Sequence, residues 1–211
     1  IQPDLGTSLL IAISGIVVLW FAGLNHKYFF YSCLLSIISL PIIISFLKPY
    51  QKLRVLTFLN PDRDPLGAGY QIIQSKIAVG SGGLRGKGYL EGTQNMLGFL
   101  PRTVAPTDFI FCVIAEETGF IGSLIILFLY TILIARCLRT SCRAIDEFGR
   151  TMALGLSVLF FSHIFVNIAM TIGLLPITGL PLPLMSYGGS FIISTLLGLG
   201  LIQSIYHILE S

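Results

Sequence analysis

The stretch TDFIFCVIAEETGFIGSLIILFLYTILIA, residues 107–135, joins a proline-punctuated loop to a long apolar run. A helix that crosses the hydrocarbon core of a bilayer needs about 20 mainly apolar residues. Positions 109–135 exceed that length, and their only charged residues are Glu116 and Glu117. The stretch therefore predicts a transmembrane helix, with the carboxylate of Asp108 at the rim of the membrane where the loop meets the helix.

The composition of the whole chain agrees with this reading. Of 211 residues, 54% are apolar and 11% charged, and the mean hydropathy is +0.86, whereas a soluble domain carries about a quarter charged residues. Segments 7–24, 28–47, 151–174 and 189–208 are also long and apolar enough to span. We therefore expect an all-α, polytopic transmembrane bundle of five helices forming one membrane domain. Because the chain opens on Ile1 without a Met or a basic leader, we also expect it to lack an upstream portion.

The basic residues indicate which side of the membrane each connection faces. Segment 136–150 carries four arginines against Asp146 and Glu147, and the charge bias of short loops predicts that it is cytoplasmic. The stretch 48–108 and the loop 175–188 then face outward. The outer stretch is itself basic, which opposes this orientation only weakly, because the rule applies to short loops and span ends. Few aromatic residues are interleaved with these bases, so nucleic-acid binding is not expected.

The outer stretch 48–108 is long enough to hold structure of its own. Segment 70–79, YQIIQSKIAV, predicts a short helix on the membrane surface, and the run VGSGGLRGKGYLEGTQ, residues 79–94, follows it. Flexible backbone N–H groups beside Arg85 and Lys87 could cradle a phosphate or an anionic headgroup. The run is not a Walker A loop, and a glycine-rich turn without a ligand is the alternative.

Asp108 has two interpretations. The sequence PTD before FIFCVIAEE is a good helix start, so Asp108 is a candidate N-cap. A carboxylate at the rim of a membrane, close to Arg102 and the glycine-rich run, is also placed to accept a proton from an incoming hydroxyl.

Other polar residues lie within the predicted spans. On a helix, Glu116 is offset by roughly 80° and Glu117 by roughly 180° from Asp108, so at least one of them faces the bundle or a wet cavity. His163 and Asn167 share a face four residues apart, which favours hydrogen bonding between helices. The four cysteines form no CxxC pair, so we expect reduced or buried thiols and no metal site.

The last outer loop, GLLPITGLPLPLMSYGGS at 173–190, carries no charge and is rich in proline and glycine. Unpaired backbone at membrane depth must line a cavity or pack on protein. The loop therefore predicts a re-entrant or cavity-lining element, in which Ser186 and Tyr187 could offer hydroxyls to a sugar or a phosphate.

At these residues the chain resembles a known family. The segment from Asn167 to Ser190, together with QPDLGTSL, GKGYLEGTQ and TDFIFCVIAEETGFIG in the same order, is similar to the hallmark motifs of the SEDS family (shape, elongation, division and sporulation proteins). The resemblance covers essentially the whole chain and implies the last five of ten membrane helices plus the large outer loop. Thr178 stands where division-type members usually carry Lys, which favours the elongation-type, RodA-like branch.

The resemblance implies a peptidoglycan glycosyltransferase in the bacterial inner membrane. Such proteins polymerise lipid II into β-1,4 glycan strands beside a class B penicillin-binding protein and other membrane proteins of the elongation complex. It maps the essential loop aspartate onto Asp108, with supporting roles for Glu116, Glu117, Asn167 and Thr178. Cations must meet the charge that develops on the leaving diphosphate. The candidates are Lys76, Arg85, Lys87 and Arg102, and a divalent cation, Mg²⁺ or Mn²⁺, could share this role.

One departure from the family pattern concerns the loop before Asp108. The family commonly reads LPExHTDF, whereas this chain reads LPRTVAPTDF, so no role of that Glu or His can be carried over. The alternatives to an elongation-type polymerase are a division-type polymerase, a transporter that flips lipid II, and a scaffold that positions the penicillin-binding protein.

Overall fold

The computed structural model describes residues 5–28, 30–32, 34–35, 38, 48–65, 67, 69–101 and 104–210. Most of the predicted span 28–47 lies outside this set, as does Arg102. The described residues form helices and no strand, which confirms the all-α prediction. These helices are α1 (Leu5–Phe21), α3 (Pro49–Leu59), η1 (Pro61–Arg63), α4 (Tyr70–Ser81), α5 (Thr93–Met96), α6 (Ile110–Arg143), α7 (Glu147–Thr171) and α8 (Gly189–Glu210).

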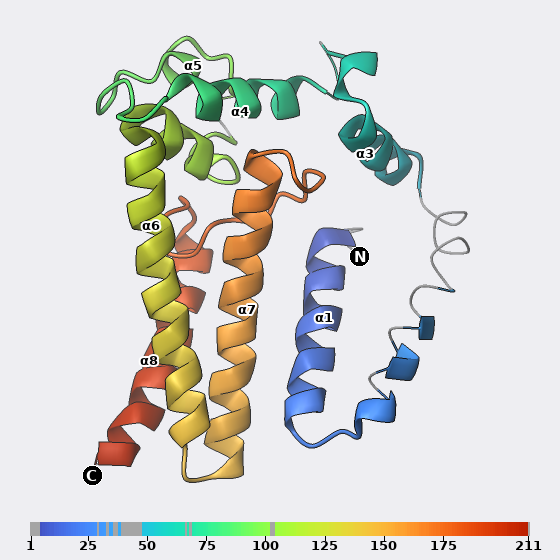
Figure 1. The fold of residues 1–211 in the computed structure, drawn as a ribbon, viewed down its shortest axis with the longest axis vertical. Coiled ribbons are helices and arrows are strands. Elements are labelled where there is room, and N and C mark those ends of the chain that lie inside the picture. Colours follow the sequence, from blue (N-terminus) through green and yellow to red (C-terminus); the bar gives the residue numbers. More distant parts are fainter. Residues whose placement is uncertain are drawn as a thin grey trace.

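Three of the described helices, α6, α7 and α8, are long and apolar enough to cross a membrane, and α1 is a shorter apolar helix. Helices α6 and α7 form an antiparallel pair joined by a short turn, α1 packs on α7, and α8 packs on both members of the pair (Figure 1). Helix α4, in the segment 70–79 where the sequence predicted a short helix, lies across the N-terminal end of α6 (Figure 1). The molecule is therefore a multi-pass membrane protein with a helical layer over one end of its bundle.

Helix α6 continues past the predicted end of its span, through the first half of segment 136–150. The reason lies in packing, because Cys137, Thr140 and Ser141 are buried there. Helix α7 then begins where the carboxylate of Asp146 accepts a hydrogen bond of 2.7 Å from the backbone N–H of Gly149, a regular N-cap.

Helix α6 is broken at Gly119, where the backbone adopts φ 69° and ψ −163°. A break of this kind leaves N–H and C=O groups without their intrahelical partners, and such groups are costly away from water. Segment 83–88 supplies the missing partners. Phe120 N–H donates to Gly83 O at 2.9 Å and Ile121 N–H to Leu84 O at 3.2 Å.

The carbonyls freed by the same break are also satisfied. Glu116 O accepts from Lys87 N–H, and Glu117 O accepts from Gly88 N–H, both at 3.1 Å. These four exchanged hydrogen bonds replace the two α-helical bonds that Phe120 and Ile121 would otherwise make to Glu116 and Glu117. We call segment 83–88, in this arrangement, the backbone staple.

The backbone staple requires a glycine in α6 and a glycine in segment 83–88. A Cβ on Gly119 would collide with the backbone of Arg85 and Gly86, and a Cβ on Gly86 would collide with Glu117 O. Both glycines also have positive φ, which L side chains rarely adopt. The glycine-rich run is therefore a packing element whose close approach to α6 depends on missing side chains.

Gly119→Ala tests this constraint. The added methyl group meets backbone atoms at a left-handed position, so we expect the whole protein to lose about 2–4 kcal/mol of stability and to melt at a lower temperature in detergent. Gly200→Ala is the matched control, because Gly200 lies in α8 with nothing within 4 Å of the new Cβ. Equal melting temperatures for both variants would contradict the staple.

Candidate functional site at the outer end of the bundle

Asp108 lies in a turn directly before α6. The backbone N–H groups of Asp108 and Phe109 both donate to Val104 O, at 3.0 and 3.1 Å. The N-cap position falls on Phe109, with no side-chain capping bond. The prediction that Asp108 caps α6 is therefore wrong, because the turn places it one residue too early. Its carboxylate is left available for another role.

The loop between α7 and α8, residues 172–188, folds back into the bundle, and we call it the return loop (Figure 1). The hydroxyl of Tyr130 donates to Pro183 O at 2.5 Å. Tyr130 lies 11 residues beyond the break at Gly119, or roughly 16 Å along α6 at 1.5 Å per residue. The predicted re-entrant character of this loop is confirmed.

The return loop is tied to the turn that carries Asp108. The hydroxyl of Ser186 donates to Thr107 O at 2.5 Å and accepts from Leu182 N–H at 2.7 Å. The backbone N–H of Tyr187 donates to Pro106 O at 2.9 Å. Residues 106 and 107 are thus fixed from the side of the return loop.

Asn167 of α7 also holds the turn that carries Asp108. It is fully buried, and its Nδ2 donates to Asp108 O at 2.8 Å and to Leu180 O at 2.7 Å. One turn away, His163 Nδ1 lies 3.3 Å from Pro181 O. The predicted shared face of His163 and Asn167 is confirmed, but their hydrogen-bond partners are loop carbonyls rather than a neighbouring helix.

The carboxylate of Asp108 is half-buried and faces Gly179 of the return loop. A Cβ on Gly179 would lie 3.4 Å from Asp108 Oδ2, so the small residue keeps space beside the carboxylate. Burial raises the pKa of Asp108 above its ordinary value of 3.8. A side-chain hydrogen bond with Thr107 and the positive charge of Arg54 on α3 lower the pKa and oppose that effect.

Arg54 is a site residue that sequence reasoning missed. It comes from α3, distant in sequence from Asp108, and its side chain is exposed. The available signal was its place in the basic outer stretch, which did not distinguish it from the other bases. Gly179 was likewise read only as a loop glycine.

The basic side chains that were predicted to bind the diphosphate have different surroundings. Lys87 Nζ forms an ion pair with Glu116 Oε1 at 2.6 Å and donates to Thr93 Oγ1 at 2.7 Å. The stem of Lys76 packs against Gly173 at the start of the return loop, and Arg85 is exposed beside the staple. Lys87 is therefore held by the protein, while Lys76 and Arg85 have accessible side chains.

The predicted phosphate cradle in the glycine-rich run is wrong for residues 86–88. The N–H groups of Gly86, Lys87 and Gly88 donate to Gly82 O, Glu116 O and Glu117 O. These donors are bound to protein carbonyls, those of Lys87 and Gly88 within the backbone staple, and are not offered to an anion.

Glu116 is fully buried, which confirms the prediction that at least one of Glu116 and Glu117 faces the bundle or a cavity. Its Oε1 accepts hydrogen bonds from the Lys87 side chain, from Thr93 Oγ1 at 3.0 Å and from Gln94 N–H at 3.1 Å. Glu117 is partly buried. Glu116 therefore locks residues 87–94 onto the first half of α6.

The side chains with hydroxyl groups that were predicted to contact or support the substrate also differ in solvent exposure. Ser186 is buried and both of its hydrogen bonds stay within the protein, whereas the side chain of Tyr187 is 76% exposed. Thr178 Oγ1 lies 3.4 Å from Met170 Sδ. A substrate-binding role of these three residues stays a prediction, and Tyr187 is the one with an open hydroxyl.

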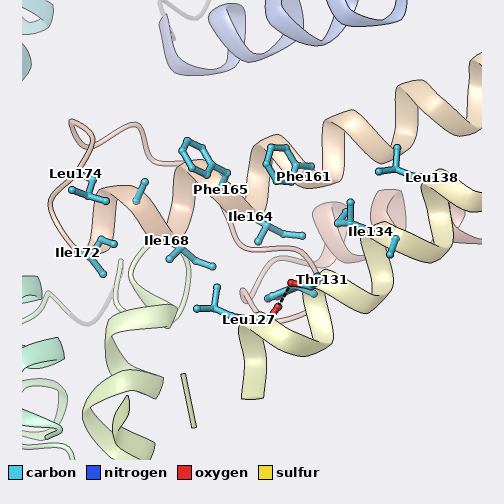
Figure 2. A pocket seen from close by; sticks show the side chains of 13 residues that line it. Leu127, Thr131, Ile134, Leu138, Phe161, Ile164, Phe165, Ile168, Ile172 and Leu174 are labelled. Atoms are coloured by element: carbon cyan, nitrogen blue, oxygen red, sulfur yellow. Dashed lines mark hydrogen bonds between the residues drawn. The ribbon is translucent and has the colours of Figure 1, made fainter. Parts of the chain in front are cut away.

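An apolar groove lies between α6 and α7, with a volume of about 400 Å³. Figure 2 shows Ile164 and Ile168 of α7 on one side and Leu127 and Ile134 of α6 on the other. The hydroxyl of Thr131 in this groove donates to Leu127 O at 2.8 Å. Tyr130 also lines the groove, but its hydroxyl is bound to Pro183 O. The groove therefore offers mainly apolar contact, which leaves the turn around Asp108 as the candidate site.

These features define a class of protein, a polytopic membrane protein with a framed carboxylate at one end of its bundle. A family model described as "Cell cycle protein" (FTSW_RODA_SPOVE) matches residues 1–210. The chain belongs to this family, and the resemblance drawn from its motifs is confirmed.

Curated relatives carry related names. The chain is 53% identical over 206 residues to the peptidoglycan glycosyltransferase MrdB of Escherichia coli strain K12, covering 97% of this chain and 55% of that protein. It is 42% identical to the probable peptidoglycan glycosyltransferase FtsW of Trichlorobacter lovleyi, over 97% of this chain and 52% of the relative. For the peptidoglycan glycosyltransferase RodA of Treponema pallidum the identity is 41%, over 92% and 46%. The chain spans about half the length of these relatives.

Solved structures share the fold. One belongs to work on the structural coordination of polymerization and crosslinking by a peptidoglycan synthase complex, with a TM-score of 0.77 and 36% identity over 99% of this chain and 57% of that one. Another is an aspartate-to-alanine variant of the rod shape determining protein RodA of Thermus thermophilus, with a TM-score of 0.59 and 28% identity over 95% and 49%.

The ion pair between Lys87 and Glu116 can be measured by a double-mutant cycle. Removing one partner of a buried pair typically costs about 3 kcal/mol or more, while replacing both is less costly. We therefore expect Lys87→Met and Glu116→Gln to lower the melting temperature separately, and the double variant to lose less than their sum. Glu117→Gln is the neighbouring control. Additive losses would show that the two side chains act independently.

Proposed function

We propose that the protein containing this chain is a peptidoglycan glycosyltransferase that polymerises lipid II into β-1,4 glycan strands at the outer face of the bacterial inner membrane. The observation that carries the proposal is the half-buried carboxylate of Asp108, held at the outer end of the bundle by the return loop and Asn167. Family membership and the names of the relatives support the reaction class.

In the proposed reaction Asp108 is the general base. It takes the proton of the acceptor sugar hydroxyl as that oxygen attacks the anomeric carbon of the donor. The new C–O bond forms as the bond to the diphosphate breaks, and the leaving polyprenyl diphosphate keeps the electron pair. Attack opposite the leaving group inverts the anomeric centre, so an α-linked donor gives a β-linked product. No covalent intermediate on the protein is required.

Positive charge near the donor diphosphate stabilises the leaving group. Lys76 and Arg85 have accessible side chains, Arg54 acts on Asp108 through its charge, and Arg102 completes the set of candidates. Among the described residues, no group of three His, Cys, Asp or Glu side chains is placed to hold a metal ion. We assign the charge stabilisation to the basic side chains, and a divalent cation, Mg²⁺ or Mn²⁺, would add positive charge at the diphosphate when bound.

A transporter that flips lipid II is the rival proposal, because broken helices are typical of transporters. In such proteins the unwound backbone commonly coordinates the cargo or a coupling ion. Here the carbonyls freed at Gly119 are occupied by Lys87 and Gly88 N–H groups. The break is thus closed by the protein itself, which favours chemistry at the rim over transport through the bundle.

We further propose that the protein works beside a class B penicillin-binding protein and other membrane proteins of the elongation complex. The similar solved structure described as a peptidoglycan synthase complex that couples polymerization to crosslinking supports a partner of that kind. The RodA-like motifs, with Thr178 where division-type members usually carry Lys, support the elongation-type branch.

Asp108→Asn in the full-length protein, assayed with its partner and purified lipid II, tests the base. We expect glycan chains to fall by at least about 100-fold, while the melting temperature at neutral pH is equal or higher. Because the pKa is raised in the folded state, stability starts to fall as the pH rises above the ordinary value of 3.8, and the loss is complete once the pH exceeds the folded-state pKa. The neutral amide avoids this cost.

Asp62→Asn, an exposed outer aspartate of η1, is the control and should polymerise normally. Undiminished polymerisation by Asp108→Asn would remove Asp108 from the mechanism. Loss of flipping, with polymerisation intact when lipid II is supplied on the outer face, would favour the transporter.

The effect of the Arg54 charge on the pKa of Asp108 can be tested by measuring polymerisation activity as a function of pH. A base must be ionised, so activity should fall as the pH drops through the pKa of Asp108, which burial places above 3.8. Arg54→Gln removes a charge that lowers this pKa, so the acidic limb should move to higher pH, and Arg54→Lys should leave it nearly in place. Identical limbs in the wild type and the Gln variant would exclude this effect of Arg54.

A further inference from the structure

A second cleft lies between α6 and α8, at the end of the bundle away from Asp108. Its volume is about 390 Å³. Its apolar lining includes Leu133 of α6 and Leu199 and Ile202 of α8. Neither the family name nor the proposed reaction accounts for it.

Three guanidinium groups of α6 line the same cleft, those of Arg136, Arg139 and Arg143. At about 100° per residue, their spacing of three and four positions places them within roughly 60° of one another, over about 10 Å of helix. They converge on one face rather than surrounding the helix end.

In the described part of the chain no ion pair joins these arginines to a carboxylate, and the ion pair formed is that of Lys87 and Glu116. The nearest acidic residue along the sequence, Asp146, uses its carboxylate to cap α7. Arg150 of α7 lies near the same end, is exposed, and does not line the cleft. Arg136, Arg139 and Arg143 are exposed as well, and they differ from Arg150 in that all three line one apolar cleft.

The α8 side adds polar groups, with Gln203 and Tyr206 lining the cleft beside its apolar residues. A site with several guanidiniums and an apolar lining suits a ligand with an anionic head and a hydrocarbon tail. Guanidinium binds phosphate in a two-pronged manner, and basic pockets between transmembrane helices on the cytoplasmic side bind anionic lipid headgroups.

We propose that the α6–α8 cleft binds the phosphate of an anionic glycerophospholipid from the cytoplasmic leaflet, with Arg136, Arg139 and Arg143 as its ligands and an acyl chain along Leu133 and Leu199. The site is independent of the polymerase reaction, so its failure would leave the role of Asp108 untouched.

Native mass spectrometry of the full-length protein, titrated with phosphatidylglycerol or with phosphatidylcholine, tests the proposal. We expect phosphatidylglycerol to bind about tenfold more tightly, and each single Arg→Gln change in the cleft to weaken it about fivefold. Arg150→Gln is the matched control and should bind like the wild type. Equal affinity for the two lipids, or equal losses in Arg150→Gln and the cleft variants, would overturn the proposal.

Gln203→Trp keeps all three positive charges and obstructs the cleft from an exposed position. It avoids any change in membrane topology that removal of arginines could cause. Loss of the preference for phosphatidylglycerol in this variant is expected, whereas an unchanged preference would assign the attraction to surface charge and refute the cleft. If inorganic phosphate displaces phosphatidylglycerol and the two lipids bind equally tightly, the cleft binds a free anion rather than a lipid, and the proposal is overturned.

Discussion

The arrangement of the half of this protein that carries Asp108 depends on backbone hydrogen bonds exchanged across a break in one transmembrane helix. At Gly119, α6 gives up bonds within itself and forms four with segment 83–88 instead. Unpaired backbone groups are costly away from water, so the break and the segment stabilise each other and neither is favourable alone. The ion pair of Lys87 with buried Glu116 adds a side-chain contact at the same place.

The turn that carries Asp108 is positioned from a second direction. The return loop enters from the α7–α8 side and fixes residues 106 and 107, while Asn167 holds the carbonyl of Asp108 itself. The carboxylate thus projects from a backbone held by α7 and by the loop that follows it. Its partial burial and its proximity to Arg54 act on its pKa in opposite directions.

Much of this could be predicted from sequence, for identifiable reasons. The lengths of the apolar segments predicted the helices, proline and glycine without charge predicted the re-entrant loop, and motif resemblance singled out Asp108. The backbone staple could not be predicted, because a glycine run that serves another helix is indistinguishable from one that serves a ligand. The roles of Arg54 and Gly179 depend on contacts between distant segments, and the N-cap assignment of Asp108 failed by a single residue of turn geometry.

The staple also has a consequence for the order of assembly. Segment 83–88 precedes α6 in the chain, so it is synthesised before the helix that it joins. Residues 110–143 can enter the bilayer as one continuous helix, in which the carbonyls of Glu116 and Glu117 accept from Phe120 and Ile121 until the earlier segment docks. The bend at Gly119 is then a product of docking rather than of insertion, and the end of the bundle that carries Asp108 acquires its final shape only when segment 83–88 docks on it.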